Sequence, residues 1–238
     1  MIIGGINKLT LIDYPGELAA IVFTKGCNFR CHHCYNPLLV VPEYTGTHIN
    51  KSHPQINSEG DFLGFLKTRL GKINAVVVSG GEPTIHKDLP IFIKKIKDLG
   101  LKVKLDTNGT NPIMLSSLIK NNLINYVAMD IKAPLNDYKK IINTEVDLIQ
   151  IQKSIKILLD TSIDYEFRST LLPKQHSLDD IHNMGMLING AKLWYIQNFK
   201  SNTDLVNLSF NEERSFNEIE LKEIVAVGTK YVQNCKLR

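Results

Sequence analysis

The sequence contains few of the features that mark membrane, secreted or nucleic-acid-binding proteins. Its 238 residues include only four Cys and one Trp, and the formal net charge is +4. The apolar runs Leu18–Phe23 and Ala75–Val78 are far shorter than the ~20 residues that span a bilayer. The opening Met1–Ile6 lacks the basic start and the long apolar stretch of a secretory signal. We therefore expect a cytoplasmic protein with reduced thiols, and neither a membrane nor a nucleic acid as its partner.

Three of the four cysteines, Cys27, Cys31 and Cys34, fall within eight residues in the spacing CxxxCxxC. Thiolates are soft ligands that select zinc, copper(I) or iron–sulfur clusters. A structural zinc ion needs four protein ligands, and His32 or His33 would have to supply the fourth from a cramped position between two cysteines. A four-iron cluster normally takes four cysteines, so three would leave one iron open to another ligand. The pattern favours a cluster over zinc, and a disulfide is disfavoured because three close thiols cannot all pair. The fourth cysteine, Cys235, is expected to be a small buried side chain on a terminal strand.

Short apolar segments alternate with longer segments that have helical spacing. The predicted strands are Leu18–Phe23, Asn74–Val78, Lys102–Asp106, Tyr126–Ile131, Tyr165–Thr170 and Leu193–Gln197. The predicted helices cover residues 58–70, 89–99, 111–121, 148–159, 178–188 and 215–230. Repeated βα units of this kind imply a parallel sheet with right-handed crossovers.

The fold class is therefore α/β, and six βα units predict a partial (β/α)6 barrel of parallel strands. A closed eight-fold barrel usually takes about 250 residues, and an open doubly wound sheet remains the other possibility. We expect a single domain over residues 1–238, with a surface insertion at Leu38–Ile56 and a C-terminal helix and strand within residues 215–238. In either fold, ligands bind at the carboxyl ends of the strands.

Polar residues follow several of the predicted strands at that end. Gly80, Gly81 and Glu82 follow the second strand, Asp106 ends the third, and Asp130 and Lys132 end the fourth, while Arg168 lies on the fifth. Two glycines allow a backbone to approach a ligand closely, although a simple tight turn explains them equally well. An Asx-type turn would explain Asp106, and an exposed ion pair of little energetic value would explain Asp130 with Lys132. For Arg168, the alternation with Tyr165 and Phe167 leaves the direction of the side chain open.

The CxxxCxxC spacing resembles the signature of radical S-adenosylmethionine enzymes. The resemblance implies that Cys27, Cys31 and Cys34 are catalytic and hold a [4Fe–4S] cluster whose open iron binds S-adenosylmethionine. Reductive cleavage then gives methionine and a 5′-deoxyadenosyl radical. His33 occupies the position that this family usually fills with an aromatic residue near the adenine, and Gly80, Gly81 and Glu82 match the motif that binds the methionine amino group.

Further stretches resemble activases of glycyl radical enzymes. These are Asp106–Gly109, the pair Asp130 and Lys132, and Phe167–Arg168. The resemblance places Asp106, Thr107, Asp130 and Lys132 around the carboxylate of S-adenosylmethionine, with Arg168 as a further candidate and, in some members, a monovalent cation.

The opening Gly5–Gly16 resembles the activating proteins of anaerobic ribonucleoside-triphosphate reductase in particular. This resemblance implies that reductase as the partner, with a flavodoxin or ferredoxin as the electron donor. Where some activases have a His that contacts the nucleoside, this chain has Gln197 and Asn198.

Two alternative functions remain open at this point. A radical S-adenosylmethionine enzyme of this size could act on a small molecule such as a deazapurine precursor. A different class of protein is a zinc-stabilised binding module, in which the three cysteines and one histidine hold the metal.

Overall fold

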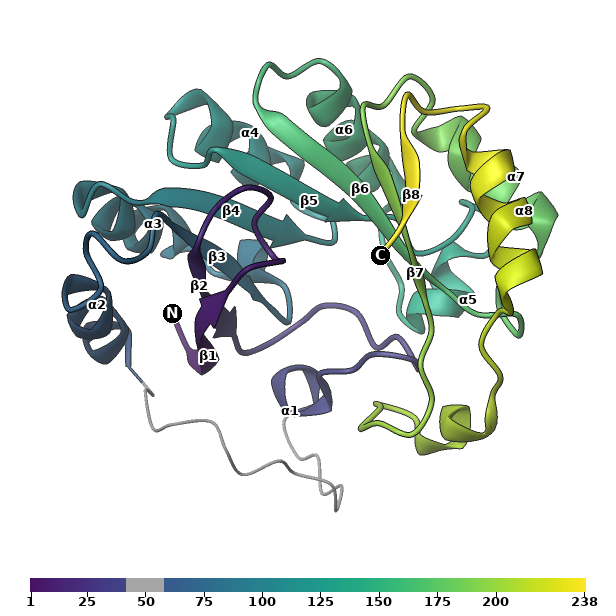
Figure 1. Cartoon of the computed structure of the whole chain (residues 1–238), viewed down its shortest axis with the longest axis horizontal. Coiled ribbons are helices and arrows are strands. Elements are labelled where there is room, and N and C mark those ends of the chain that lie inside the picture. Colours follow the sequence, from purple (N-terminus) through teal and green to yellow (C-terminus); the bar gives the residue numbers. More distant parts are fainter. Residues whose placement is uncertain (42–57) are drawn as a thin grey trace.

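The computed structural model describes residues 1–41 and 58–238, and it contains one curved sheet (Figure 1). The strands lie side by side in chain order, β1 to β8. Strands β2 to β8 are parallel, and only β1 is antiparallel, paired with β2. The strands are β1 Ile3–Thr10, β2 Ala19–Thr24, β3 Ala75–Gly80, β4 Lys102–Thr107, β5 Tyr126–Asp130, β6 Asp164–Leu171, β7 Trp194–Asn198 and β8 Cys235–Leu237.

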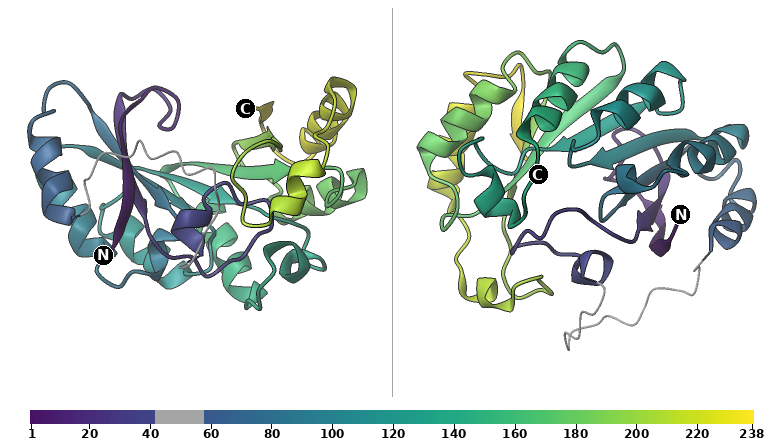
Figure 2. Two further views of the ribbon diagram at one scale, coloured as in Figure 1. Left: turned by 90° about the horizontal axis from the view of Figure 1, so that it is seen from below. Right: turned by 180° about the vertical axis from the view of Figure 1, so that it is seen from behind.

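Most helices lie around the outside of the curved sheet, as the views in Figures 1 and 2 agree. The helices are α1 Pro37–Val40, α2 Glu59–Lys67, α3 Leu89–Asp98, α4 Pro112–Lys120, α5 Tyr138–Ile142, α6 Leu148–Leu159, α7 Leu178–Leu187 and α8 Glu218–Gly228. Two short 3-10 turns, η1 Pro83–Ile85 and η2 Leu208–Glu212, complete the described elements. No helix of the described residues is both long and apolar enough to cross a membrane.

The strands are buried because both faces of the sheet are covered. In β3, the side chains of Val76 and Val78 pack outward against the helices, in the main core. On the other face, Val77 belongs to a second, smaller cluster inside the barrel, which also contains Tyr14 and Tyr126. A strand covered in this way has an unbroken apolar sequence, as Ala75–Val78 does. Polar residues in the barrel interior are therefore exceptions, and they mark the region where a site is to be sought.

The structure confirms the partial barrel of parallel strands and all six predicted strands, to within two residues at each end. Cys235 is buried on the terminal strand β8, as expected. The prediction missed the antiparallel strand β1 and the short helix α5. Of the predicted insertion Leu38–Ile56, residues 38–41 are described, and Val40 is buried at the end of α1; the remainder lies outside the described residues.

Helix α3 provides a direct test of how the helices pack on the sheet. Ile96 is fully buried in the main core, whereas Ile91 on the same helix is 62% exposed. We expect Ile96→Ala to lower the free energy of unfolding by about 2–5 kcal/mol, because it removes core contacts and leaves a cavity. The matched Ile91→Ala should change it by less than about 0.5 kcal/mol. Urea titration of the reduced protein measures both, and equal losses would contradict this packing.

Candidate active site

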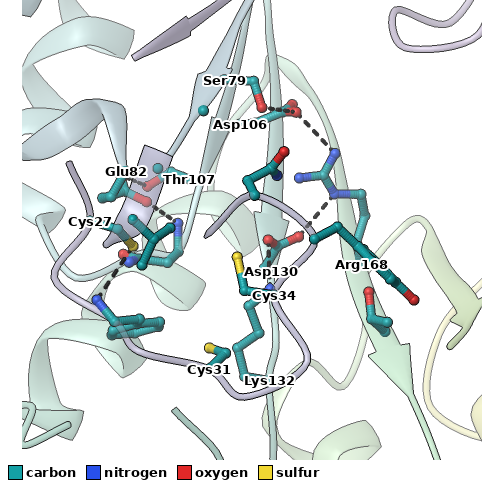
Figure 3. A pocket seen from close by; sticks show the side chains of 18 of the residues that line it. Cys27, Cys31, Cys34, Ser79, Glu82, Asp106, Thr107, Asp130, Lys132 and Arg168 are labelled. Atoms are coloured by element: carbon teal, nitrogen blue, oxygen red, sulfur yellow. Dashed lines mark hydrogen bonds and ion pairs between the residues drawn. The ribbon is translucent and has the colours of Figure 1, made fainter. Parts of the chain in front are cut away.

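A cavity of about 250 Å³ lies at the carboxyl ends of the strands, and residues from β3 to β7 line it together with the loop after β2 (Figure 3). Every site residue predicted from the sequence is found on its wall. These are Cys27, Cys31, His33, Cys34, Gly80, Gly81, Glu82, Asp106, Asp130, Lys132 and Arg168. Strands that are adjacent and parallel bring their carboxyl ends to one edge of the sheet, so residues far apart in sequence meet there.

The three cysteines of the loop are reduced and largely shielded from solvent. Burial raises the pKa of the Cys27 and Cys31 thiols to about 12, because a thiolate in this position has lost its hydration. A bound metal reverses that preference, since a coordinating thiol loses its proton. Three reduced thiols that face one cavity are therefore a donor set suited to a metal group.

The geometry does not suit a single zinc ion. Within the described ranges, no three His, Cys, Asp or Glu side chains converge closely enough to hold one metal ion. Sulfurs on one tetrahedral zinc lie about 3.8 Å apart, since each Zn–S bond is about 2.3 Å long. Thiols spread along a cavity wall fit a larger multi-iron group better, because each sulfur then binds a different metal atom.

The glycine turn after β3 packs directly against the start of the cysteine loop. The Gly81 amide donates to the carbonyl of Thr24 at 2.9 Å, and the Glu82 amide donates to that of Gly26 at 2.8 Å. A Cβ atom on Gly81 would lie 1.9 Å from the Gly26 carbonyl oxygen, and Gly80 has a φ of +127°. Both positions require glycine, because the backbones of the two loops approach each other too closely here for a side chain.

Glu82 is 1% exposed, and hydrogen bonds occupy both of its carboxylate oxygens. Oε1 accepts from the Thr84 amide, the Thr84 hydroxyl and the Thr107 hydroxyl, at 3.1, 2.5 and 2.7 Å. Oε2 accepts from the Asn108 amide at 2.6 Å. Burial raises the Glu82 pKa, and these hydrogen bonds offset part of that increase. The side chain therefore joins η1 to the loop after β4, a role that the sequence did not indicate.

The charged residues form one connected chain across the strand ends (Figure 3). Arg168 donates from its NH1 nitrogen to Asp106 at 3.1 Å and from Nε to Asp130 at 3.0 Å. Lys132 donates to the other oxygen of Asp130 at 3.0 Å, and Ser79 donates to Asp106 at 3.0 Å. Arg168 thus points into the cavity, which settles the direction that its strand left open.

This connected series of charged residues differs from the weak surface ion pair that could have explained Asp130 and Lys132. Their side chains are only 24% and 18% exposed, and Arg168 is a third partner. Burial by itself would raise the pKa of Asp130, but Arg168 and Lys132 outweigh burial and lower the pKa to about 2. The carboxylate is therefore ionised at neutral pH, and two cations face the cavity beside it.

The structure separates three residues that the sequence resemblance brought into question for contacts to a nucleoside. His33 is 3% exposed, and burial, reinforced by Lys132, lowers its pKa to about 3, so the ring is neutral. Gln197 lines the cavity and accepts a hydrogen bond from Thr170 at 3.3 Å. Asn198 instead uses its amide on the backbone of Phe216, at 2.8 and 3.1 Å, and is not part of the cavity wall.

A segment after β7, which the sequence did not indicate, holds the cysteine loop from outside. After β7, the Val206 amide donates to the Cys34 carbonyl at 3.1 Å, and the Asn207 amide donates to the His32 carbonyl at 3.0 Å. The ring of His32 stacks on Phe210, with ring centroids 5.3 Å apart. These contacts are mostly backbone bonds between distant segments, so only the apolar residues in this otherwise polar stretch could have signalled them. Figure 1 shows this segment beside the chain that leads to α1.

The hydrogen bonds of Glu82 predict a loss of stability when its charge is removed. In Glu82→Gln, one carboxylate oxygen becomes an NH2 group that faces a backbone or hydroxyl donor. We expect the free energy of unfolding of the metal-free protein to fall by about 1–3 kcal/mol, because a buried donor loses its acceptor. The control Glu223→Gln, at an exposed position of α8, should leave it unchanged. Equal stability of the two variants in urea titration would refute the assigned role of Glu82.

Known proteins share both the sequence pattern and the fold. A family model described as the Radical SAM superfamily matches residues 21–184. A protein of Methanocaldococcus jannaschii, provisionally named a glycyl-radical enzyme activating enzyme, is 33% identical over 242 residues, covering 100% of this chain and 95% of that protein. A 7-carboxy-7-deazaguanine synthase of Thermoplasma acidophilum is 28% identical over 155 residues, covering 65% of this chain and 66% of that one.

Two solved structures share the fold at low sequence identity. A domain of pyruvate-formate lyase-activating enzyme from Bacteroides vulgatus has a TM-score of 0.56 at 14% identity, covering 69% of this chain and 99% of that domain. Streptococcus suis SuiB bound to its precursor peptide SuiA has a TM-score of 0.61 at 14% identity, covering 92% of this chain and 48% of that one. The likeness to these structures concerns the fold alone. The family match and the M. jannaschii relative together lead to one conclusion: the chain belongs to the radical S-adenosylmethionine superfamily, as an enzyme of the glycyl-radical activating type.

Proposed function

We propose that this enzyme generates a glycyl radical on anaerobic ribonucleoside-triphosphate reductase, using a [4Fe–4S] cluster and S-adenosylmethionine. The observation that carries the proposal is the wall of the cavity, where three reduced thiols lie beside a chain of charged groups at the strand ends. The thiols suit the cluster, and the charges suit the carboxylate and amino groups of a bound amino acid. The three cysteines and the charged residues from Asp106 to Arg168 all lie within residues 21–184, the range that the Radical SAM superfamily model matches.

In this proposal, each part of the wall holds one part of the cofactors. Cys27, Cys31 and Cys34 hold the cluster, and Lys132 and Arg168 attract the methionine carboxylate. Backbone groups of the glycine turn, which line the cavity, hold the amino group. When bound, the cluster supplies the electron that cleaves S-adenosylmethionine, and the radical so formed takes a hydrogen atom from the partner's glycine.

His33 and Gln197 are proposed to contact the nucleoside. A neutral imidazole offers a flat ring for the adenine, and the Gln197 amide offers both a donor and an acceptor for hydroxyl groups. Asn198 is not proposed for this role, because its amide is already bonded to the backbone of Phe216.

A monovalent cation, which the resemblance allowed, finds little support in the arrangement of charges. Such a cation would lie between the two carboxylates of Asp106 and Asp130. In this structure, the guanidinium of Arg168 joins those carboxylates, at 3.1 and 3.0 Å. We therefore propose that the guanidinium of Arg168 replaces the monovalent cation between these two carboxylates.

The choice of partner rests on likeness. The M. jannaschii relative bears the name of a glycyl-radical enzyme activating enzyme and aligns with the whole chain, and residues 5–16 resemble activators of the reductase. A flavodoxin or ferredoxin is proposed as the electron donor, because the cleavage consumes an electron that the protein does not itself supply. The deazaguanine synthase relative makes a small-molecule substrate the second candidate.

The assignment of the thiols predicts which cysteine substitutions abolish the metal site. After anaerobic reconstitution with iron and sulfide, Cys34→Ala should lose most of the bound iron and the brown colour of the wild-type protein. The matched Cys235→Ala should retain both, because Cys235 is buried on β8, outside the cavity wall. Iron analysis and absorption spectra measure the effect. If Cys34→Ala kept its iron, or if the wild-type protein bound zinc alone, the cluster assignment would be wrong.

The partner is tested by incubating the reduced enzyme and S-adenosylmethionine with the anaerobic reductase of the same organism. We expect the electron paramagnetic resonance doublet of a glycyl radical, with formation of 5′-deoxyadenosine. The control is a reductase whose radical-bearing glycine is replaced by alanine, which should give no doublet. If the reductase gave no glycyl-radical doublet and a deazapurine precursor were converted, the small-molecule function would be favoured instead.

A further inference from the structure

The series of charged residues at the strand ends continues into the barrel interior, toward the amino ends of β4 and β6. On β4, Lys104 lies two residues before Asp106, and its ammonium group is 3.7 Å from the Oδ1 atom of Asp106. The same ammonium group is 3.3 Å from the carboxylate of Glu166 on β6, which lies two residues before Arg168. Residues two apart on a strand share a face, so these pairs form two layers of one interior face. Arg238, just beyond β8, donates to Glu166 at 3.0 Å.

The lower layer lies behind the cavity and not on its wall. The side chains of Lys104 and Glu166 are both 0% exposed, and neither residue lines the cavity. Their remaining partners are structural: Lys104 donates to the Asp13 carbonyl at 2.5 Å, and Glu166 accepts from the Tyr126 hydroxyl at 2.8 Å. Buried ion pairs add little stability compared with apolar residues of the same size, so stability alone does not explain this pair.

Asp106 is the point at which the two layers meet. Its Oδ2 atom accepts hydrogen bonds from Ser79 and Arg168, at 3.0 and 3.1 Å. Its Oδ1 atom is buried and has no hydrogen-bond partner in the described part of the chain, and the ammonium group of Lys104 lies 3.7 Å from it. Without Lys104, Arg168 would be the only cation of residues 1–41 and 58–238 beside Asp106, and it would be drawn toward that carboxylate and away from Asp130.

We propose that Lys104 and Glu166 are positioning residues, which set the affinity for S-adenosylmethionine by holding Asp106 and Arg168 from behind. This inference rests on the proposed function, because it assumes that the cavity binds that ligand. Charges alternate along the whole series, which runs Arg238, Glu166, Lys104, Asp106, Arg168, Asp130, Lys132. Four cations and three carboxylates leave it with one positive charge, which the carboxylate of a ligand would neutralise.

A pair of variants separates positioning from simple structural support. Lys104→Met leaves Glu166 without its lysine partner, so both stability and affinity should fall. The double variant Lys104→Met/Glu166→Gln removes the carboxylate charge as well, and its thermal midpoint should return to within about 3 °C of the wild-type value. In the double variant, Asp106 still lacks the ammonium group of Lys104 and keeps only Arg168 as a cationic neighbour among the described residues. The dissociation constant of the double variant for S-adenosylmethionine, measured on reconstituted protein, should therefore stay about tenfold higher than that of the wild-type protein.

A second measurement does not depend on the ligand. In nitrogen-labelled full-length protein before reconstitution, the Nε–H resonance of Arg168, assigned with Arg168→Lys, should move in the double variant. The control Lys94→Met/Asp98→Asn removes an exposed ion pair of α3 and should change none of these quantities.

The outcomes separate the two proposals. An unmoved Arg168 resonance would overturn the inference, and so would a dissociation constant that recovers together with the thermal midpoint. A moved resonance in a protein whose wild-type form binds no S-adenosylmethionine would refute the proposed function, and with it the effect on affinity. A moved resonance with persistently weak binding in the stable double variant would establish Lys104 and Glu166 as positioning residues.

Discussion

The close backbone contact between the cysteine loop and the glycine turn is the constraint on which the rest of the site depends. Strands β2 and β3 are in register with Thr24 opposite Gly80, so the two loops leave the sheet side by side. Glycine at positions 80 and 81 lets the backbones meet, and the amides of residues 81 and 82 bond to the opposite loop. Glu82 then connects this contact to the end of β4 and the loop after it, through hydrogen bonds from Thr107 and Asn108. Two further hydrogen bonds, both from Thr84, hold its carboxylate in place. One rigid unit therefore fixes the first cysteine relative to the charged residues of the neighbouring strands.

The cavity combines two walls with different physical requirements. The thiol wall is poorly hydrated, which favours the neutral thiols until a metal binds. The charged wall keeps its ions in a buried setting only because each carboxylate has a cation beside it, as Asp130 has in Arg168 and Lys132. An incoming molecule with a carboxylate and an amino group would meet preorganised partners on this wall, and the site would need little rearrangement to bind it.

Much of this arrangement could be predicted from the sequence. The features that could not be predicted were missed for identifiable physical reasons. Unbroken apolar runs such as Ala75–Val78 correctly predicted the parallel strands. The tight cysteine spacing predicts a metal site, which stays a prediction. Strand β1 was missed because its outer edge is solvated and two glycines interrupt its pattern. The role of Glu82, the direction of Arg168 and the support from Val206 and Asn207 depend on contacts between segments far apart in the chain, on which sequence periodicity carries no information.

The central claim is that three thiols of this cavity hold a cluster whose open iron binds S-adenosylmethionine. Electron paramagnetic resonance of the reduced, anaerobically reconstituted protein, recorded with and without S-adenosylmethionine, tests that claim most directly. The account predicts a reduced-cluster signal whose shape changes when the ligand is added, because the ligand binds an iron that has no cysteine. A signal that is identical with and without the ligand, or the absence of any cluster signal, would contradict it.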